Sequence, residues 1–219
     1  PVGHVEAGLR TGDPRAPFPE ELNRRLVDQL ASIWFAPTDL AREHLLAEGH
    51  DPARIHVTGN PVVDALHEMR AAVADRPLAD FPELAGLGLD GRPVVLVTAH
   101  RRENHGEALG RICAALTALA ADGVEIVWPV HPNPDVQRVV GPALRDRARI
   151  ATTGALSYPA FVRLMLGASL VLTDSGGVQE EAACLGRPTL ILRDKTERPE
   201  VFATGVVALV GTETARIVD

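Results

Sequence analysis

The stretch Leu170-Val171-Leu172-Thr173-Asp174-Ser175-Gly176-Gly177-Val178-Gln179-Glu180-Glu181 decides the fold class of this chain. Its apolar, β-branched start predicts a strand, its two glycines predict a tight turn, and a helix pattern follows at once and stops at Gly186. Backbone N–H groups and the dipole at such a helix start favour an anion. We therefore predict a nucleotide diphosphate site at this turn. The alternative is a turn that needs glycine only for its geometry.

Composition excludes several classes of protein. The 219 residues carry a net charge of −7, which argues against a nucleic-acid partner, and no apolar run approaches the roughly 18 residues of a membrane span. The histidines do not form an H-x-x-x-H pair, so we expect no metal. Cys113 and Cys184 lack C-x-x-C spacing, and we expect buried free thiols in a cytoplasmic protein.

Strand and helix patterns alternate along the chain. Strands are predicted at residues 1–10 (with an exit loop), 33–36, 55–58, 94–98, 125–130, 148–152, 170–173, 189–192 and 206–210. Helices are predicted at residues 19–31, 38–47, 63–73, 107–121, 134–144, 158–166 and 178–185. Continuous Val/Ile/Leu strands between helices indicate an α/β, doubly wound parallel sheet, whose ligands bind beyond the carboxyl ends of the strands. Residues 76–92, rich in proline and glycine, are predicted to link two domains.

Charged clusters follow several predicted strands. His100, Arg101 and Arg102 form a cationic turn that suits a diphosphate and its departure; an exposed charged loop is the alternative. The loop 193–200 offers Arg198 as a contact for substrate or phosphate, with mutual ion pairs as the alternative.

Two acidic side chains near the start of the chain are candidates for acid–base chemistry. Glu6 follows the first predicted strand, with Arg10 placed to hold an anion or to orient Glu6. Glu20 shares one helix face with Asn23 and Arg24. The alternatives are a structural salt bridge for the first cluster and a solvated helix start for the second.

Together these motifs resemble the non-hydrolysing bacterial UDP-N-acetylglucosamine 2-epimerases. The likeness runs in order along essentially the whole chain, through the motifs His4-Val5-Glu6-Ala7-Gly8-Leu9-Arg10-Thr11-Gly12, Pro19-Glu20-Glu21-x-Asn23-Arg24, Thr58-Gly59-Asn60-Pro61-Val62-Val63-Asp64, His100-Arg101-Arg102-Glu103, His131-Pro132-Asn133-Pro134, Thr173 to Glu181 and Arg193-Asp194-x-Thr196-Glu197-Arg198-Pro199-Glu200. The resemblance implies a GT-B type fold with two Rossmann-like domains and a substrate cleft between them. Residues 1–75 are then the C-terminal part of the N-terminal domain, residues 76–92 the inter-domain linker region, and residues 93–219 the nucleotide-binding C-terminal domain, cut short at its end.

The resemblance also implies a reaction. UDP-GlcNAc and UDP-ManNAc interconvert by loss of the C2 proton and of UDP, through a bound 2-acetamidoglucal, with no cofactor or metal. By motif, Glu6 and Glu20 match acids near the sugar, and His100 matches the histidine near the leaving phosphate. The substrate-binding matches are the cradle Ser175, Gly176 and Gly177, the ribose acid Glu181, the substrate-side Arg198 and Phe161 beside the uracil. We add Arg10 and Arg101 to the predicted substrate contacts from their charge clusters.

The family's early glycine- and lysine-containing loop and a further catalytic aspartate lie before the segment that Pro1 begins, so we expect an inactive fragment of a longer enzyme. That enzyme is expected to be a cytoplasmic homodimer in cell-envelope polysaccharide biosynthesis. A GT-B glycosyltransferase, a hydrolysing 2-epimerase and a regulatory domain that binds a nucleotide sugar remain alternatives.

Overall fold

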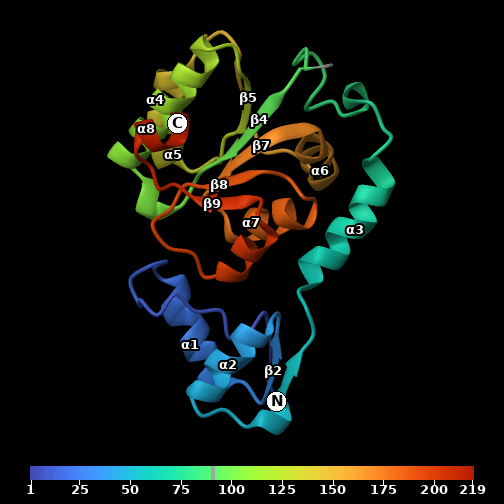
Figure 1. The fold of residues 1–219 in the computed structure, drawn as a ribbon, viewed down its shortest axis with the longest axis vertical. Coiled ribbons are helices and arrows are strands. Elements are labelled where there is room, and N and C mark those ends of the chain that lie inside the picture. Colours follow the sequence, from blue (N-terminus) through green and yellow to red (C-terminus); the bar gives the residue numbers. More distant parts are fainter. Residues whose placement is uncertain (90–91) are drawn as a thin grey trace. The chain divides into compact units, whose positions relative to one another are not determined.

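The strand patterns of the sequence form two separate parallel sheets in a computed structural model, which describes residues 1–89 and 92–219 (Figure 1). The described residues divide into two units, Pro1–Asp64 with Lys195–Pro199, and Ala65–Asp194 with Glu200–Asp219. Within this part of the chain no helix combines the length and apolar character needed to cross a bilayer.

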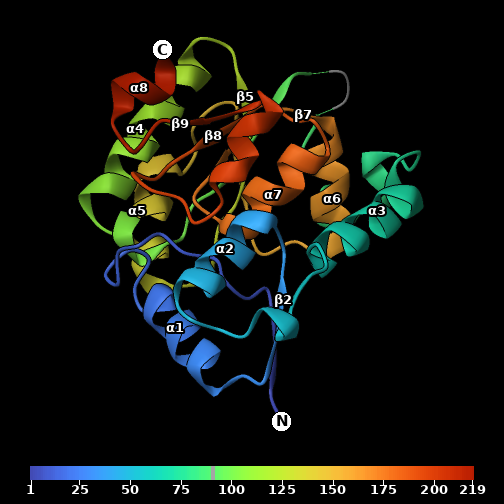
Figure 2. The same cartoon turned by 60° about the horizontal axis from the view of Figure 1, so that its bottom comes forward.

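The first unit contains a sheet of three strands in the order β1 (Gly3–Val5), β2 (Ile33–Ala36) and β3 (Ile55–Val57). The accompanying helices are α1 (Glu20–Leu30), α2 (Asp39–Ala47) and the start of α3 (Pro61–Val73) (Figure 2). Helix α2 begins where the Thr38 hydroxyl accepts a hydrogen bond from the Ala41 N–H. Its Leu45 packs with Trp34 in the small core of this unit.

The second unit contains a sheet of six strands in the order β6-β5-β4-β7-β8-β9. The strands are β4 (Val94–Thr98), β5 (Glu125–Pro129), β6 (Ile150–Thr153), β7 (Ala168–Thr173), β8 (Thr189–Ile191) and β9 (Val207–Leu209). The chain builds outward from β4 to β6 and then returns to place β7 beside β4. Such a reversal of strand order is where parallel sheets bind ligands.

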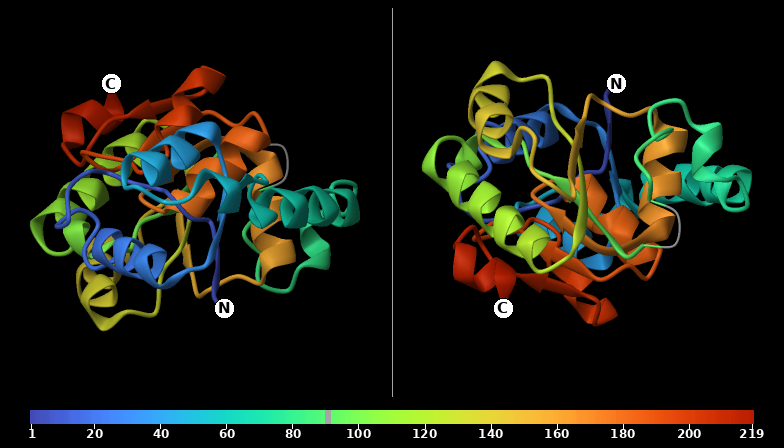
Figure 3. Two further views of the ribbon diagram at one scale, coloured as in Figure 1. Left: turned by 90° about the horizontal axis from the view of Figure 1, so that it is seen from below. Right: turned by 90° about the horizontal axis from the view of Figure 1, so that it is seen from above.

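Helices cover both faces of the larger sheet (Figure 3). Helices α4 (Glu107–Ala121), α5 (Pro134–Leu144) and α8 (Thr214–Val218) share one core with one set of strand side chains. Helices α3, α6 (Tyr158–Gly167) and α7 (Gly176–Cys184) pack against the opposite face. Leu96 and Leu172 are fully buried, which explains why their strands are apolar throughout. The predicted α/β, doubly wound parallel sheet is confirmed.

The division into units differs from the predicted domain bounds. Leu66 and Val73 of α3 lie in the core of the second unit, so its boundary falls after Asp64 rather than at residue 75. Most of the predicted linker, residues 76–92, also packs on this unit, with Phe81 and Leu84 buried. Residues 90 and 91 of that linker lie outside the described residues.

The prediction of two buried thiols is wrong for Cys184, which is exposed, because it ends α7 on its outer side.

Candidate functional site

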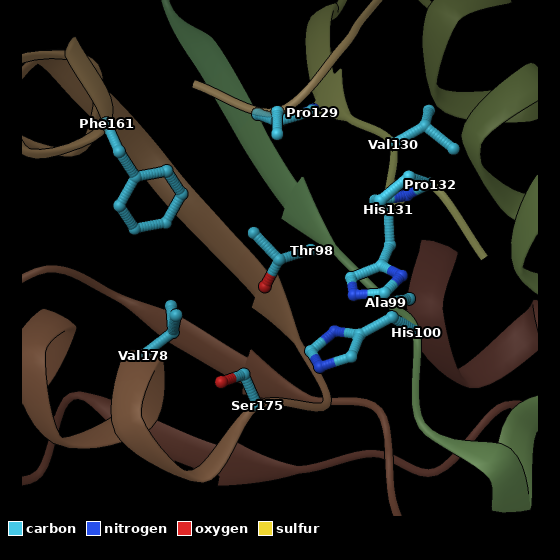
Figure 4. A pocket seen from close by; sticks show the side chains of 11 residues that line it. Thr98, Ala99, His100, Pro129, Val130, His131, Pro132, Phe161, Ser175 and Val178 are labelled. Atoms are coloured by element: carbon cyan, nitrogen blue, oxygen red, sulfur yellow. The ribbon is translucent and has the colours of Figure 1, made fainter. Parts of the chain in front are cut away.

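A pocket of about 220 Å³ lies at the reversal of strand order in the second unit. It opens beyond the carboxyl ends of β4, β5 and β7 (Figure 4). Its lining residues are Thr98, Ala99, His100, Pro129, Val130, His131, Pro132, Ala155, Phe161, Ser175 and Val178. The predicted site residues His100, Phe161 and Ser175 therefore share one pocket, although they come from three separate parts of the sequence.

Ser175 and Val178, at the start of α7, line this pocket, whereas the predicted cradle residues Gly176 and Gly177 between them are not among its lining residues. Ser175 is the N-cap residue of the helix, and its hydroxyl makes no capping hydrogen bond. Gly177 has an ordinary helical backbone, and a Cβ placed there would meet no atom within 4 Å. Glycine is therefore not required here by a left-handed turn. Among the described residues nothing crowds this position, so the phosphate interpretation of the turn stays a prediction that rests on the helix N-terminus.

The ring of His100 lies parallel to that of His131, with ring centroids 5.1 Å apart and planes inclined by 12° (Figure 4). Nδ1 of His100 is 3.4 Å from Oδ1 of the buried Asp174. Burial lowers the pKa of His100, and the Asp174 carboxylate partly opposes this. Neither His131 nor Asp174 is among the predicted site residues. Both occur in stretches that follow strand ends.

Two further predicted contacts of the second unit lie outside the pocket lining. Arg101 donates its backbone N–H to Oδ2 of Asp174 at 2.8 Å, so its main chain helps to build the turn after β4. Glu181, in α7, is buried and accepts a hydrogen bond from the Tyr158 hydroxyl at 2.7 Å. Burial raises the pKa of Glu181, although the bond from Tyr158 opposes this.

Glu6 occupies an unusual backbone position in the first unit. It follows β1 directly and has φ of 64°, in the left-handed region that residues other than glycine rarely adopt. Its carboxylate accepts hydrogen bonds from Nδ2 of Asn60, at 2.9 Å, and from the guanidinium of Arg198. Backbone strain of this kind clusters at functional sites. Asn60 belongs to the motif before α3, but its contact with Glu6 was not predicted.

Arg198 extends this contact into a line of alternating charges. It also donates to the buried Glu197 at 3.0 Å, and Glu197 lies 3.7 Å from Arg24 of α1. The predicted charge clusters that contain Glu6, Glu20 and Arg198 thus lie in one unit. Glu20, the first residue of α1, is half-buried one helical turn before Arg24.

Arg10 lies in a different network from Glu6. Its buried guanidinium bonds Asp28 at 2.6 Å and Glu48 at 2.8 and 2.7 Å. These two acids raise the pKa of Arg10 against the opposing effect of burial. This geometry corresponds to the structural salt bridge that the sequence left as an alternative. The network holds the loop after β1, whose Gly8 oxygen also bonds His44 at 2.9 Å.

The chain is similar to known proteins along its whole length. The family model described as UDP-N-acetylglucosamine 2-epimerase matches residues 1–219. A UDP-N-acetylglucosamine 2-epimerase of Yersinia pestis is 48% identical over 223 residues, covering 100% of this chain and 59% of the relative. The crystal structure of UDP-GlcNAc 2-epimerase from Neisseria meningitidis, bound to UDP-GlcNAc, has a TM-score of 0.94 at 42% identity, covering 100% of this chain and 60% of that one. The S. aureus MnaA–UDP co-structure has a TM-score of 0.89 at 38% identity, with 100% and 57% covered.

The parallel sheets and these structural matches define an α/β protein of the GT-B type, as predicted. The chain belongs to the UDP-N-acetylglucosamine 2-epimerase family. It spans about three fifths of the length of the relatives that it matches.

Proposed function

We propose that this protein interconverts UDP-GlcNAc and UDP-ManNAc by inversion at C2 of the sugar. The observation that carries the proposal is the family match over residues 1–219, combined with a pocket that gathers His100, Phe161 and Ser175 at the strand-order reversal. The Neisseria relative was solved bound to UDP-GlcNAc and the S. aureus relative bound to UDP. These complexes support a nucleotide or nucleotide sugar that contains UDP as the ligand here.

The second unit is proposed to hold the UDP part of the substrate. The N-terminus of α7 with Ser175, Gly176 and Gly177 offers N–H donors to the diphosphate. Phe161 provides an apolar wall for the uracil. Glu181 is proposed to bind the ribose, because its carboxylate can accept hydrogen bonds from the ribose hydroxyls.

The chemical step is proposed to begin with removal of the C2 proton by a carboxylate of the first unit. The C1–O bond then breaks, its electron pair leaves with UDP, and a C1–C2 double bond forms 2-acetamidoglucal. Protonation on the other face of C2 and return of the UDP oxygen to C1 complete the inversion. Glu6 and Glu20 are the proposed acid–base groups, and His100 donates a proton to the departing diphosphate. The strained backbone of Glu6 and its two hydrogen bonds support a fixed orientation for its carboxylate.

Arg198 is proposed to contact substrate from its place beside Glu6, whereas Arg10 is proposed to position the loop that carries Glu6. The Asp28 and Glu48 partners of Arg10 support the second assignment. Arg101 is proposed to assist at the diphosphate through its cationic turn.

Self-association and location are further proposals. The natural full-length protein is proposed to be a homodimer, which light scattering of that protein tests. We also propose a cytoplasmic enzyme that supplies UDP-ManNAc to cell-envelope polysaccharide synthesis; fractionation and a deletion strain test this.

The decisive experiment is product analysis after incubation of the natural full-length protein with UDP-GlcNAc. Chromatography and NMR are expected to show UDP-ManNAc without any acceptor present. Free ManNAc with UDP would instead indicate a hydrolysing epimerase. Transfer that requires an acceptor would indicate a glycosyltransferase, and binding without turnover would indicate a regulatory domain.

A further inference from the structure

The carboxylate of Asp174 holds together three strand ends of the second unit. It follows β7 directly and is fully buried. Its Oδ2 accepts hydrogen bonds from the backbone N–H groups of His100 and Arg101, at 2.9 and 2.8 Å, and from Nδ2 of Asn104 at 2.9 Å. Asn104 in turn donates to the Leu192 carbonyl, just after β8, at 2.9 Å. Three donors on one oxygen fix the orientation of the carboxylate.

The other oxygen of this carboxylate faces the ring of His100. Oδ1 is buried and has no hydrogen-bond partner among the described residues, and it lies 3.4 Å from Nδ1 of His100. An ionised carboxylate oxygen accepts hydrogen bonds and donates none, so it favours a proton on the ring nitrogen that faces it. Hydrogen bonds of catalytic groups are often long in the absence of a ligand and shorten when one binds. The opposite ring nitrogen, Nε2, is then the one left to meet a ligand in the pocket (Figure 4).

We propose that Asp174 is a positioning residue that keeps His100 in the Nδ1–H tautomer and so leaves Nε2 to carry a proton to the departing diphosphate. The inference rests on the proposed function for the identity of the leaving group, but the tautomer itself does not depend on it. In this neutral tautomer Nε2 carries no proton, so it takes one up from solvent when the anionic diphosphate binds. The resulting imidazolium keeps its Nδ1–H directed at the Asp174 carboxylate and passes the Nε2 proton to the departing diphosphate. This arrangement stabilises the cation at the point where the phosphate needs it.

Asp174 is the acidic group among the side chains that act on the pKa of His100. Burial lowers the pKa of His100, and His131, Arg101 and His105 lower it further, while Asp174 is the group that raises it. Among these four side chains Asp174 alone is acidic. His100 is therefore neutral above pH 7 without ligand, which is the condition in which its tautomer is measurable.

The first test measures the tautomer in the unaltered protein. The natural full-length protein with ¹⁵N-labelled histidine is studied without ligand near pH 8 by two-bond ¹⁵N–¹H correlation, and His100 is assigned by its loss in His100→Gln. The expected result is protonated Nδ1 and unprotonated Nε2. A His100 ring protonated on Nε2 would overturn the proposal. This test requires no folded variant of Asp174.

The second test is Asp174→Asn, which keeps the shape of the side chain. Its carbonyl oxygen can take the place of Oδ2, and the amide N–H₂ then faces Nδ1 of His100. We expect the tautomer to switch to Nε2–H, the pKa of His100 to fall, and kcat to fall about 10²–10⁴-fold with a much smaller change in KM. An unchanged tautomer in a folded variant would contradict the inference.

The matched control is Asp135→Asn, an exposed carboxylate 3.9 Å from Nδ1 of His105. It removes the same charge beside a neighbouring histidine and is expected to leave the tautomer of His100 unchanged. The two proposals fail separately. An Nδ1–H tautomer in a protein without epimerase activity would reject the proposed function alone, whereas normal turnover with the Nε2–H tautomer would reject the positioning role alone.

Discussion

Arg198 donates a hydrogen bond to the carboxylate of Glu6, although 192 residues separate the two along the chain. The segment Lys195–Pro199, which follows β8 of the second unit, belongs by its contacts to the first unit. Because Asn60 bonds the same carboxylate, Glu6 is fixed from two directions. This fixed carboxylate is the centre of the proposed chemistry, and the first prediction concerns it.

Glu6→Gln is expected to lower kcat about 10²–10⁴-fold, because glutamine keeps the shape and hydrogen bonding of the side chain but cannot exchange a proton. Binding of UDP, measured by calorimetry, is expected to persist. Glu43→Gln, at an exposed position of α2, serves as the control and should leave turnover unchanged. Near-normal turnover in both Glu6→Gln and Glu20→Gln would show that the acid–base groups lie elsewhere in the protein.

Glu181→Ala is expected to raise KM for UDP-GlcNAc. The rise should correspond to a loss of about 1.5–3 kcal/mol of binding free energy, which is the contribution of a hydrogen bond to a charged group. The comparison variant is Tyr158→Phe, which removes the 2.7 Å bond to Glu181 but leaves the carboxylate in place. The change in its KM is expected to correspond to no more than about 1 kcal/mol of binding free energy. Steady-state kinetics distinguish the two, and an unchanged KM in Glu181→Ala would rule out a ribose contact at this position.

Gly8→Ala is expected to destabilise the first unit severely. Gly8 has φ of 83°, and a Cβ there would lie 2.1 Å from the Ala41 carbonyl oxygen of α2. The control is Gly12→Ala, which has a similar φ of 78° but no atom within 4 Å of the added carbon. Left-handed strain alone costs about 1–2 kcal/mol, whereas the clash should bring the Gly8 variant to about 4 kcal/mol or more. Equal losses in urea unfolding would mean that the loop does not pack on α2 as described.

Asp28 is expected to make stability depend on pH. Burial would raise the pKa of Asp28, but the hydrogen bonds from His4 and Arg10 lower it overall. A depressed pKa in the folded state means that the stabilisation is present above the unfolded value of about 3.9 and is lost as the pH falls through the folded pKa. In urea unfolding, Asp28→Asn should therefore be less stable than the original protein at pH 7, and the difference should shrink below about pH 4. Asp64→Asn, on the exposed start of α3, should show no such trend. A gap that stays constant with pH would contradict this assignment.

Much of the fold is predictable because its signals are local. The run Val94–Thr98 is apolar on both faces, and Gly186 has φ of 64° just after α7, so strand and helix ends follow from neighbouring residues. The partner of a helix is not a local property. The apolar face of α3 is visible in the sequence, but only the folded chain shows that Leu66 and Val73 pack in the second unit.

The candidate site is predictable to a similar degree, with the same limit. The glycine turn and His100 were found because they directly follow buried strands. The hydrogen bond from Asn60 to Glu6 joins residues that are 54 positions apart, and the spacing of residues in the sequence does not predict such a contact. Arg10 shows the converse, because a charged cluster after a strand looks the same whether its partner is a substrate or, as here, the buried Asp28.

The most direct test of the central claim is the exchange of the C2 hydrogen with solvent. The natural full-length protein is incubated with UDP-GlcNAc in D₂O, and both sugar nucleotides are analysed by NMR and mass spectrometry. The account predicts UDP-ManNAc that carries deuterium at C2 from its first appearance, slowed in Glu6→Gln in step with turnover. UDP-ManNAc that keeps the original hydrogen at C2, or a complete absence of epimerisation, would contradict it.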